Sequence, residues 1–102
     1  MRNVNLDEKY ISQIGEILKK NLQEYSAKPY FYGSRVKGKN AKYSDVDIAV
    51  RAEKKLPFGV LCGIKDDLTE STIPYFVDVI DLNSVSEKFK KCIENDLVEF
   101  SY

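Results

Sequence analysis

The sequence predicts an α+β domain, in which helical and extended segments alternate along a chain of 102 residues. Two observations lead to this prediction. Apolar residues recur at helical spacing in several segments, and runs rich in β-branched and aromatic residues lie between them. The expected order is helix, strand, loop, strand, helix, strand, helix, strand. A chain of this length has room for one modest core, so we expect a single domain over residues 1–102.

The first helix is expected from Glu8 to Tyr25, with Asp7 placed to cap its N-terminus. Its apolar side chains fall on one face, which we expect to be buried: Ile11, Ile14, Leu18, Leu22 and Tyr25. The pair Lys28-Pro29 is expected to end this helix, because the residue before a proline disfavours helical geometry. The first two strands follow, at residues 30–32 and 45–51.

A second long helix is expected after Pro57, which suits the first turn of a helix. Its inner face would comprise Phe58, Leu61, Ile64 and Leu68. Residues 75–82 form the third expected strand, since Val77, Val79 and Ile80 are strong β formers.

The last helix is expected to begin at Ser84, because Glu87 three residues later completes the pattern of a capping box. Its inner face would comprise Val85, Phe89, Cys92 and Ile93. Residues 97–102 would then add a short final strand.

Composition excludes several classes of function. The chain has no histidine, which excludes His-based triads and His-containing zinc sites. Its formal net charge is zero, so the whole chain has no electrostatic preference for nucleic acid. Cys62 and Cys92 lack metal-type spacing, and we expect buried free thiols in preference to a disulfide. No leader or membrane-spanning segment is evident, so we expect a cytoplasmic protein that binds no membrane.

The stretch from Tyr30 to Arg51 has the clearest potential for chemistry. It begins with an aromatic run that ends at Gly33-Ser34. Residues 25–44 then include five basic side chains and no acidic one: Lys28, Arg35, Lys37, Lys39 and Lys42. This local charge suits a triphosphate, although Lys37 and Lys39 taken singly are expected to be solvated surface residues.

Asp45 and Asp47 stand two residues apart at the start of the second expected strand. Residues at this spacing in a strand point to the same face, so the two carboxylates would lie side by side. A hard divalent cation such as Mg²⁺ would relieve their repulsion. Gly33 allows close approach of the backbone to a ligand, and a short helix starting near Ser34 would favour an anion. Together these features predict a site for a nucleoside triphosphate.

The combined pattern resembles the G-S…D-x-D signature of the DNA polymerase β-type nucleotidyltransferases, because ten residues separate Gly33-Ser34 from Asp45-Val46-Asp47. The fuller form is similar to the minimal nucleotidyltransferases, which are met as antitoxins paired with HEPN-domain toxins, and it adds Arg35, Gly38 and Ser44. The resemblance covers nearly the whole chain. It implies a polymerase β-like fold, with a small mixed sheet and helices packed mainly on one face.

A third carboxylate is expected from the strand at residues 75–82. Asp78 lies in an apolar segment, where an ionised side chain is costly without a partner, and it matches the third aspartate of the family. Asp81 is the competing candidate. Strand alternation puts it on the opposite face, and its place before Ser84 suits a structural role. We therefore favour Asp78.

The resemblance implies a two-metal mechanism for these residues. Asp45, Asp47 and Asp78 would bind two Mg²⁺ ions and form the catalytic set, with Asp78 as general base. ATP would be the donor, and the nucleotide would contact Gly33, Ser34, Arg35 and Ser44. An alternative for Arg35 is a structural pairing with Asp78 or with a loop carbonyl.

The resemblance also implies a protein acceptor. The enzyme would transfer AMP to a hydroxyl of a HEPN-type toxin, or of a small helical substrate-binding protein encoded nearby, and so act as an antitoxin by AMPylation. Several alternatives stay open. A catalytically silent antitoxin would neutralise its partner by binding alone, and a small-molecule nucleotidyltransferase would act on an antibiotic. A module that only binds metal or nucleotide is the remaining alternative.

Overall fold

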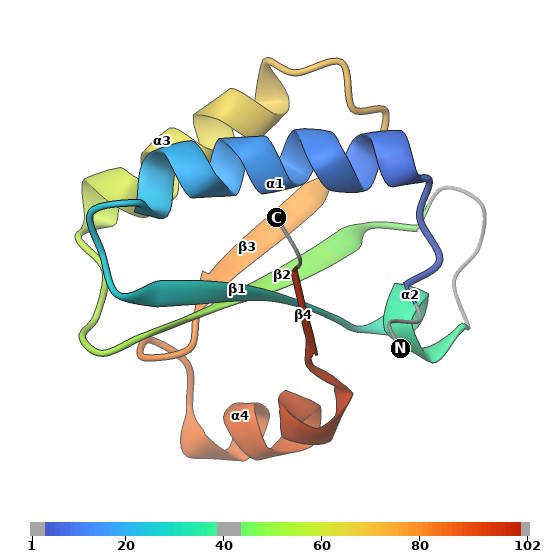
Figure 1. Ribbon diagram of the computed structural model, residues 1–102. Coiled ribbons are helices and arrows are strands. Elements are labelled where there is room, and N and C mark those ends of the chain that lie inside the picture. The colour runs from blue at the N-terminus through green and yellow to red at the C-terminus, as the bar shows by residue number, and fades with distance from the viewer. Residues whose placement is uncertain (1–3, 39–43, 101–102) are drawn as a thin grey trace.

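The computed structural model describes residues 4–38 and 44–100. Within these ranges the chain forms one four-stranded mixed sheet with helices on both of its faces (Figure 1). The elements in chain order are α1 (Glu8–Leu22), β1 (Ala27–Tyr32), α2 (Ser34–Lys37), β2 (Val46–Ala52), α3 (Phe58–Thr69), β3 (Val77–Asp81), α4 (Glu87–Ile93) and β4 (Val98–Glu99). A 3₁₀ turn, Glu94–Asp96, follows α4.

The strands lie in the order β3-β2-β1-β4. β1 pairs antiparallel with β2 and with β4, whereas β2 pairs parallel with β3 after the crossover through α3. α1 and α3 lie together over one face of the sheet, and α4 lies on the other face (Figure 1). The predicted α+β fold, with a small mixed sheet and helices mainly on one face, is confirmed.

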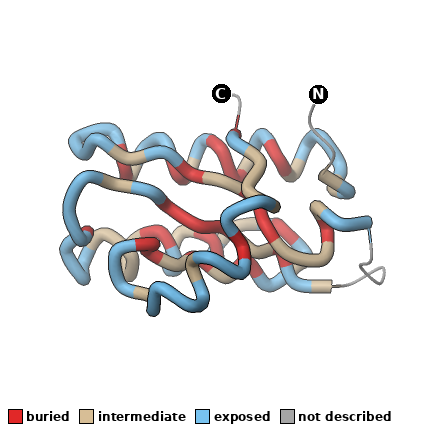
Figure 2. Tube along the Cα trace, turned by 90° about the horizontal axis from the view of Figure 1, so that it is seen from below, coloured by how far each residue is buried: buried red, intermediate tan, exposed pale blue. Residues whose placement is uncertain are grey.

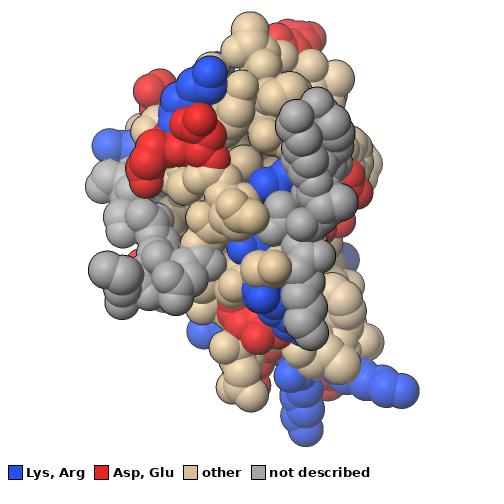
Figure 3. Space-filling model, turned by 90° about the vertical axis from the view of Figure 1, so that its right-hand side faces the viewer, with Lys and Arg blue, Asp and Glu red and all other residues tan. Residues whose placement is uncertain are grey.

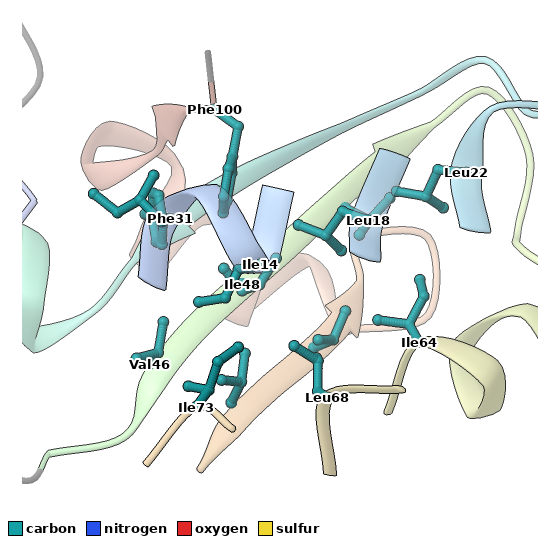
Figure 4. Packing of buried hydrophobic residues seen from close by; sticks show 14 of the residues in the cluster. Ile14, Leu18, Leu22, Phe31, Val46, Ile48, Ile64, Leu68, Ile73 and Phe100 are labelled. Atoms are coloured by element: carbon teal, nitrogen blue, oxygen red, sulfur yellow. The ribbon is translucent and has the colours of Figure 1, made fainter. Parts of the chain in front are cut away.

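Alternation along β2 separates two apolar clusters. Val46, Ile48 and Val50 belong to the larger cluster beneath α1 and α3, whereas Ala49 belongs to a smaller cluster beneath α4. The larger cluster brings α1, α3 and the sheet together around Ile14, Leu18, Phe31, Ile64, Leu68 and Phe100 (Figure 4). Buried residues run along the strands and the inner sides of the helices (Figure 2). The apolar side chains of the strands are therefore taken up by the core, and polar side chains of the strands lie outside these two clusters.

α1 begins where the sequence predicts, and the Asp7 carboxylate accepts a hydrogen bond from the Lys9 N–H at 3.0 Å. The expected inner face is buried as far as Leu22. The helix ends there, earlier than predicted, and Tyr25 is exposed. The prediction that Tyr25 belongs to the core was wrong, because apolar periodicity alone does not mark the last turn.

β1 is longer than predicted, since it begins at Ala27 and includes Pro29. Proline is tolerated here because of the side that its nitrogen faces. In a strand the nitrogen and carbonyl of one residue point to the same side, and the Pro29 carbonyl accepts from the Phe100 N–H at 3.2 Å. The missing N–H therefore faces the end of the two-residue β4 and costs β2 no hydrogen bond.

Two helix predictions in the second half of the chain need correction. Phe58, expected on the inner face of α3, is 83% exposed, because it occupies the first residue of the helix, past the core that covers Ile64 and Leu68. The cap of α4 is Ser86, whose hydroxyl accepts from the Phe89 N–H at 3.1 Å. Ser84 instead donates its N–H to the Asp81 carbonyl in the turn that ends β3.

The later start of α4 changes which side chains face inward. Ile93 is buried as predicted, whereas Phe89 and Cys92 are exposed. Cys62 is half-buried, and both cysteines are free thiols. Among the residues that the structure describes, no helix combines the length and apolar character needed to cross a membrane.

Candidate active site

A row of three polar side chains crosses the sheet on the face that carries α4. In the pairing register, Tyr32 of β1 stands opposite Asp47 of β2, and Asp47 stands beside Asp78 of β3. Neighbouring strands are about 4.8 Å apart, so the three side chains are near neighbours. Asp45, two residues before Asp47, precedes the first residue of β2. The parallel pairing of β2 with β3 thus brings together the aspartates that the sequence singled out.

The carboxylates of this row repel one another. Burial raises the pKa of the Asp47 carboxyl above its ordinary value, and the charges of Asp78 and then Asp45 raise this pKa further. Across residues 4–38 and 44–100, no lysine or arginine forms an ion pair with Asp45, Asp47 or Asp78. The row is therefore a concentration of negative charge that the described side chains do not balance.

Tyr32 is a member of the row that sequence reasoning missed. Burial, followed by the charges of Asp47 and Asp78, raises the pKa of its hydroxyl to about 12. The phenol therefore stays neutral at physiological pH and can donate a hydrogen bond beside the carboxylates. Its ring packs edge-to-face on Phe89, with centroids 6.3 Å apart. Only the strand register identifies this residue, and the sequence shows no more than an aromatic run.

Gly33 lies where β1 ends and α2 begins, directly against Asp47. Its φ of +87° falls in the left-handed region that favours glycine. A Cβ at this position would collide with the Asp47 carboxylate. Both observations require glycine. The N–H groups of Val36 and Lys37 donate to the Gly33 carbonyl, whereas that of Ser34 has no partner within α2.

Arg35 is only 5% exposed and its guanidinium contacts backbone carbonyls. One Nη1–H donates to the Asn5 carbonyl at 2.6 Å, and one Nη2–H donates to the Ser44 carbonyl at 2.9 Å. The guanidinium also stacks 4.5 Å from the centre of the Tyr75 ring. These contacts hold the N-terminal segment, the start of β2 and the segment before β3 together, which favours the structural alternative for Arg35 over contact with phosphate.

The basic stretch does not form a free cationic surface. Lys37 pairs with Asp96 at 3.3 Å, and Lys28 pairs with Glu99 at 3.9 Å. Lys39 and Lys42 lie outside the described residues. Acidic and basic side chains are interspersed on the face shown in Figure 3. Structural partners therefore engage Lys28, Arg35 and Lys37, and these three side chains add little to the basic surface expected for a triphosphate.

Asp81 has the structural role that the sequence proposed as its alternative. It is 2% exposed and lies on the core face, opposite to Asp78. Its carboxylate accepts hydrogen bonds from the Leu56 N–H at 2.7 Å and the Asn83 N–H at 2.9 Å. These bonds connect the end of β3 to the end of the loop that leads into α3, so Asp81 is occupied away from the row.

The donor chemistry of the row suits a hard divalent cation. Carboxylate oxygens are the preferred ligands of Mg²⁺, and the uncompensated charge around Asp47 would be relieved by such an ion. The described carboxylates do not converge on one point, however. In residues 4–38 and 44–100, no group of three or more His, Cys, Asp or Glu is arranged to hold a metal ion.

Asp47→Asn is expected to raise the thermal stability of the chain at neutral pH. Because the folded-state pKa of Asp47 lies above its ordinary value, the ionised carboxyl opposes folding. Removing the unfavourable charge of one such carboxyl typically adds about 0.5–2 kcal/mol to the free energy of unfolding. In a domain of this size, about 1 kcal/mol corresponds to a rise of roughly 4–8 °C in melting temperature. Thermal melts at pH 7 measure the change.

The control for this variant is Asp66→Asn, at an exposed position of α3, which should melt within experimental error of the unchanged chain. The gain from Asp47→Asn should shrink as the pH falls through the raised pKa of Asp47, because the carboxyl then becomes neutral. A lower melting temperature for Asp47→Asn at pH 7 would contradict this account of the row.

Comparison with known families identifies the fold. The family model described as "Polymerase beta, Nucleotidyltransferase" matches residues 12–99. This match covers α2, β2 and β3, and with them Gly33 and all three aspartates. The chain belongs to the polymerase β nucleotidyltransferase family.

One curated relative is named "Probable protein adenylyltransferase MntA" and comes from Haemophilus influenzae. It is 39% identical to the nucleotidyltransferase chain over 77 residues, which are 76% of this chain. The matched part spans 66% of the length of the relative.

Two solved structures share the architecture over most of the chain. A toxin–antitoxin complex with AMP-PNP superposes with a TM-score of 0.73 and 25% identity, covering 89% of this chain and 72% of the other. An AMPylated HEPN toxin from Shewanella oneidensis in complex with its MNT antitoxin gives a TM-score of 0.69 at 23% identity, covering 94% of this chain and 72% of the other. The second similarity concerns the fold alone.

Proposed function

We propose that this nucleotidyltransferase domain transfers AMP from ATP to a hydroxyl of a partner protein and thereby acts as the antitoxin of a HEPN-type toxin. The observation that carries the proposal is the row in which Asp47 and Asp78 stand side by side next to Gly33. Family membership and the curated relative of 39% identity support nucleotidyl transfer to protein. The solved complexes support a toxin as the partner.

The proposed roles follow from the position of each residue. Asp45, Asp47 and Asp78 would hold two Mg²⁺ ions, which when bound would neutralise the triphosphate and lower the pKa of the acceptor hydroxyl. The backbone at Gly33 and Ser34 would contact the β- and γ-phosphates, because it approaches Asp47 closely. Arg35, which directly follows Ser34, would fix the position of this backbone through its hydrogen bond to the Ser44 carbonyl.

The proposed reaction is an in-line displacement. The acceptor oxygen forms a bond to the α-phosphorus while the bond from that phosphorus to the bridging oxygen of pyrophosphate breaks. The proton of the acceptor hydroxyl moves to the Asp78 carboxylate, which stands at the outer end of the row. Tyr32, a neutral phenol beside Asp47, would donate a hydrogen bond to a phosphate oxygen or to the carboxylate.

One observation favours the alternative of a silent antitoxin. In the described residues the aspartates are not arranged as a closed metal site, so the partner or the nucleotide must complete the arrangement in an active enzyme. A protein that only binds its toxin would not need a complete metal site.

Transfer from labelled ATP tests the proposed function. The chain, a HEPN-type partner and Mg²⁺ are incubated with ATP labelled at either the α- or the γ-phosphate. We expect label on the partner from α-labelled ATP only, because the γ-phosphate leaves with pyrophosphate. Label from γ-labelled ATP would show phosphoryl transfer, and label from neither, with all four nucleotides tried, would reject the transferase.

A further inference from the structure

Asp45 is held differently from the other two aspartates of the candidate site. Asp47 and Asp78 lie within paired strands, and the pairing of β2 with β3 fixes their backbone. Asp45 precedes the first residue of β2 and is exposed. Its position therefore depends on what holds its two neighbours in the chain, Ser44 and Val46.

Both of these neighbours are restrained by the two residues that directly precede β3. The Val46 N–H donates to the Phe76 carbonyl at 2.9 Å. The Ser44 carbonyl accepts from Nε–H and Nη2–H of Arg35, at 3.3 Å and 2.9 Å. Tyr75 stacks on the same guanidinium, whose centre lies 4.5 Å from the centre of the ring. The segment before β3 thus restrains the chain on both sides of the exposed aspartate.

We infer that Tyr75 is a positioning residue for the proposed metal site: its ring fixes Arg35, which through the Ser44 carbonyl fixes Asp45 relative to Asp47. This inference rests on the proposed function and adds a residue outside the G-S…D-x-D motif. Tyr75 acts through Arg35 and needs no contact with the nucleotide or the metal.

The contacts of Arg35 explain why the ring matters. The guanidinium is buried, so its N–H groups need acceptors, and it reaches the Asn5 carbonyl at 2.6 Å as well as the Ser44 carbonyl. A planar fork meets both carbonyls in only a few of the conformations open to a long side chain. The face of the Tyr75 ring attracts the cation and favours one of them.

The ring of Tyr75 is itself held by α1. Tyr10 packs against it edge-to-face, with centroids 5.6 Å apart and planes at 86°. Both tyrosines also pack against the larger apolar cluster. A chain of contacts therefore runs from the core helix through Tyr10, Tyr75 and Arg35 to the residue before Asp45. Loosening the Tyr75 contact should leave the core in place and displace the aspartate.

Binding of Mn²⁺ to the full chain, measured by water-proton relaxation with and without AMP-PNP, tests this role. Mn²⁺ is a paramagnetic substitute for Mg²⁺ that also prefers oxygen ligands. Tyr75→Leu should weaken Mn²⁺ binding about three- to tenfold. This is less than the roughly 10–100-fold typical for a residue that contacts a metal ligand directly, because Tyr75 is one contact further away.

Two further variants separate the stack from general effects. Tyr75→Phe keeps the face of the ring and should bind Mn²⁺ as the unchanged chain does, since the Tyr75 hydroxyl makes no hydrogen bond with the described residues. Tyr30→Leu removes the ring from a comparable pair, in which Arg51 lies 5.4 Å from the ring centre, and should also bind normally. Equal losses in Tyr30→Leu and Tyr75→Leu would contradict the inference.

Amide hydrogen exchange measures the effect on the backbone without any metal. In Tyr75→Leu the Val46 N–H should exchange about three- to tenfold faster, because the chain around it opens more often. The Leu82 N–H donates to the Val50 carbonyl at the other end of the same strand pair, and its exchange should not change. Equal acceleration at both amides would mean a general loss of stability and would reject a positioning role.

A double variant tests whether Tyr75 acts through Arg35. Lysine has no planar fork for the two carbonyls, so Arg35→Lys should also weaken Mn²⁺ binding. Adding Tyr75→Leu to Arg35→Lys should cause little further loss, because the two residues act on the same carbonyl. Losses that simply add would show that Tyr75 does not act through Arg35.

Transfer from α-labelled ATP distinguishes failure of this inference from failure of the proposed function. At saturating Mn²⁺, Tyr75→Leu should transfer AMP within about twofold of the unchanged chain, because the ring affects metal affinity and not the chemical step. Unchanged Mn²⁺ affinity in Tyr75→Leu would overturn the inference and leave the transferase proposal standing. The expected change in affinity without any transfer by the unchanged chain would reject the transferase and support the role of Tyr75. No Mn²⁺ binding by the unchanged chain, with or without AMP-PNP, would reject both.

Discussion

Gly33→Ala is expected to lower nucleotidyl transfer at least a hundredfold and to destabilise the fold by about 2–4 kcal/mol. At a φ of +87° an L-residue is strained, and the added Cβ would collide with the Asp47 carboxylate. Either the strand end or the carboxylate must move, and a displacement of about 1 Å at a reacting centre costs about a hundredfold in rate. Urea unfolding and the α-label transfer assay measure the two effects.

Gly38→Ala is the matched control for this variant. Gly38 also has a positive φ, +72°, but a Cβ there would meet nothing within 4 Å. We expect the backbone strain alone, about 1–2 kcal/mol, with transfer retained. Similar losses of transfer in both variants would show that strain, and not the approach of Gly33 to Asp47, matters for the site.

Asp78→Asn is expected to reduce transfer about 10²–10⁴-fold, the range for loss of a general base. The chain should lose no stability, because removing the Asp78 charge also relieves its repulsion with Asp47. The amide cannot take the proton of the acceptor hydroxyl. Asp78 is half-buried on the polar row, and no structural hydrogen bond of its carboxylate is present among the described residues. Single-turnover kinetics with the partner and ATP measure the change.

Asp81→Asn should behave in the opposite way. In a buried position, each oxygen of the Asp81 carboxylate accepts a hydrogen bond from one backbone N–H group. The oxygen of an asparagine amide can keep one of these bonds, but its NH₂ group cannot accept the other. The variant should lose about 1–3 kcal/mol of unfolding free energy and keep its transfer rate once folded. If Asp81→Asn lost transfer and Asp78→Asn did not, the assignment of the third carboxylate would be reversed.

Much of the fold was predictable because the strongest patterns are local. The cap at Asp7 and the apolar spacing of α1 depend on residues within a few positions of one another. The end of α1, the start of β1 and the cap of α4 were not predicted well. Pro29 is accepted only because β4 is short, and Ser84 is used by a turn that closes on Asp81. Such contacts are set by tertiary structure.

In the candidate site, too, the local motif was predictable from the sequence and the contacts set by tertiary structure were not. The motif placed Gly33, Asp45, Asp47 and Asp78 correctly near one another, since the parallel pairing of β2 with β3 brings Asp47 beside Asp78. Tyr32 was missed because its place opposite Asp47 depends on an antiparallel register that crosses a loop. The position of Arg35 was equally hidden, because its partners, the Asn5 and Ser44 carbonyls, come from distant parts of the chain.

The intact mass of the partner protein tests the central claim most directly. The partner is incubated with ATP, Mg²⁺ and either the unchanged chain or a variant with asparagine at Asp45, Asp47 and Asp78. We predict a gain of one or more AMP units with the unchanged chain and no gain with the variant, although the variant still forms the complex. No gain with the unchanged chain, together with full neutralisation of the toxin by the variant, would contradict transfer and support an antitoxin that acts by binding.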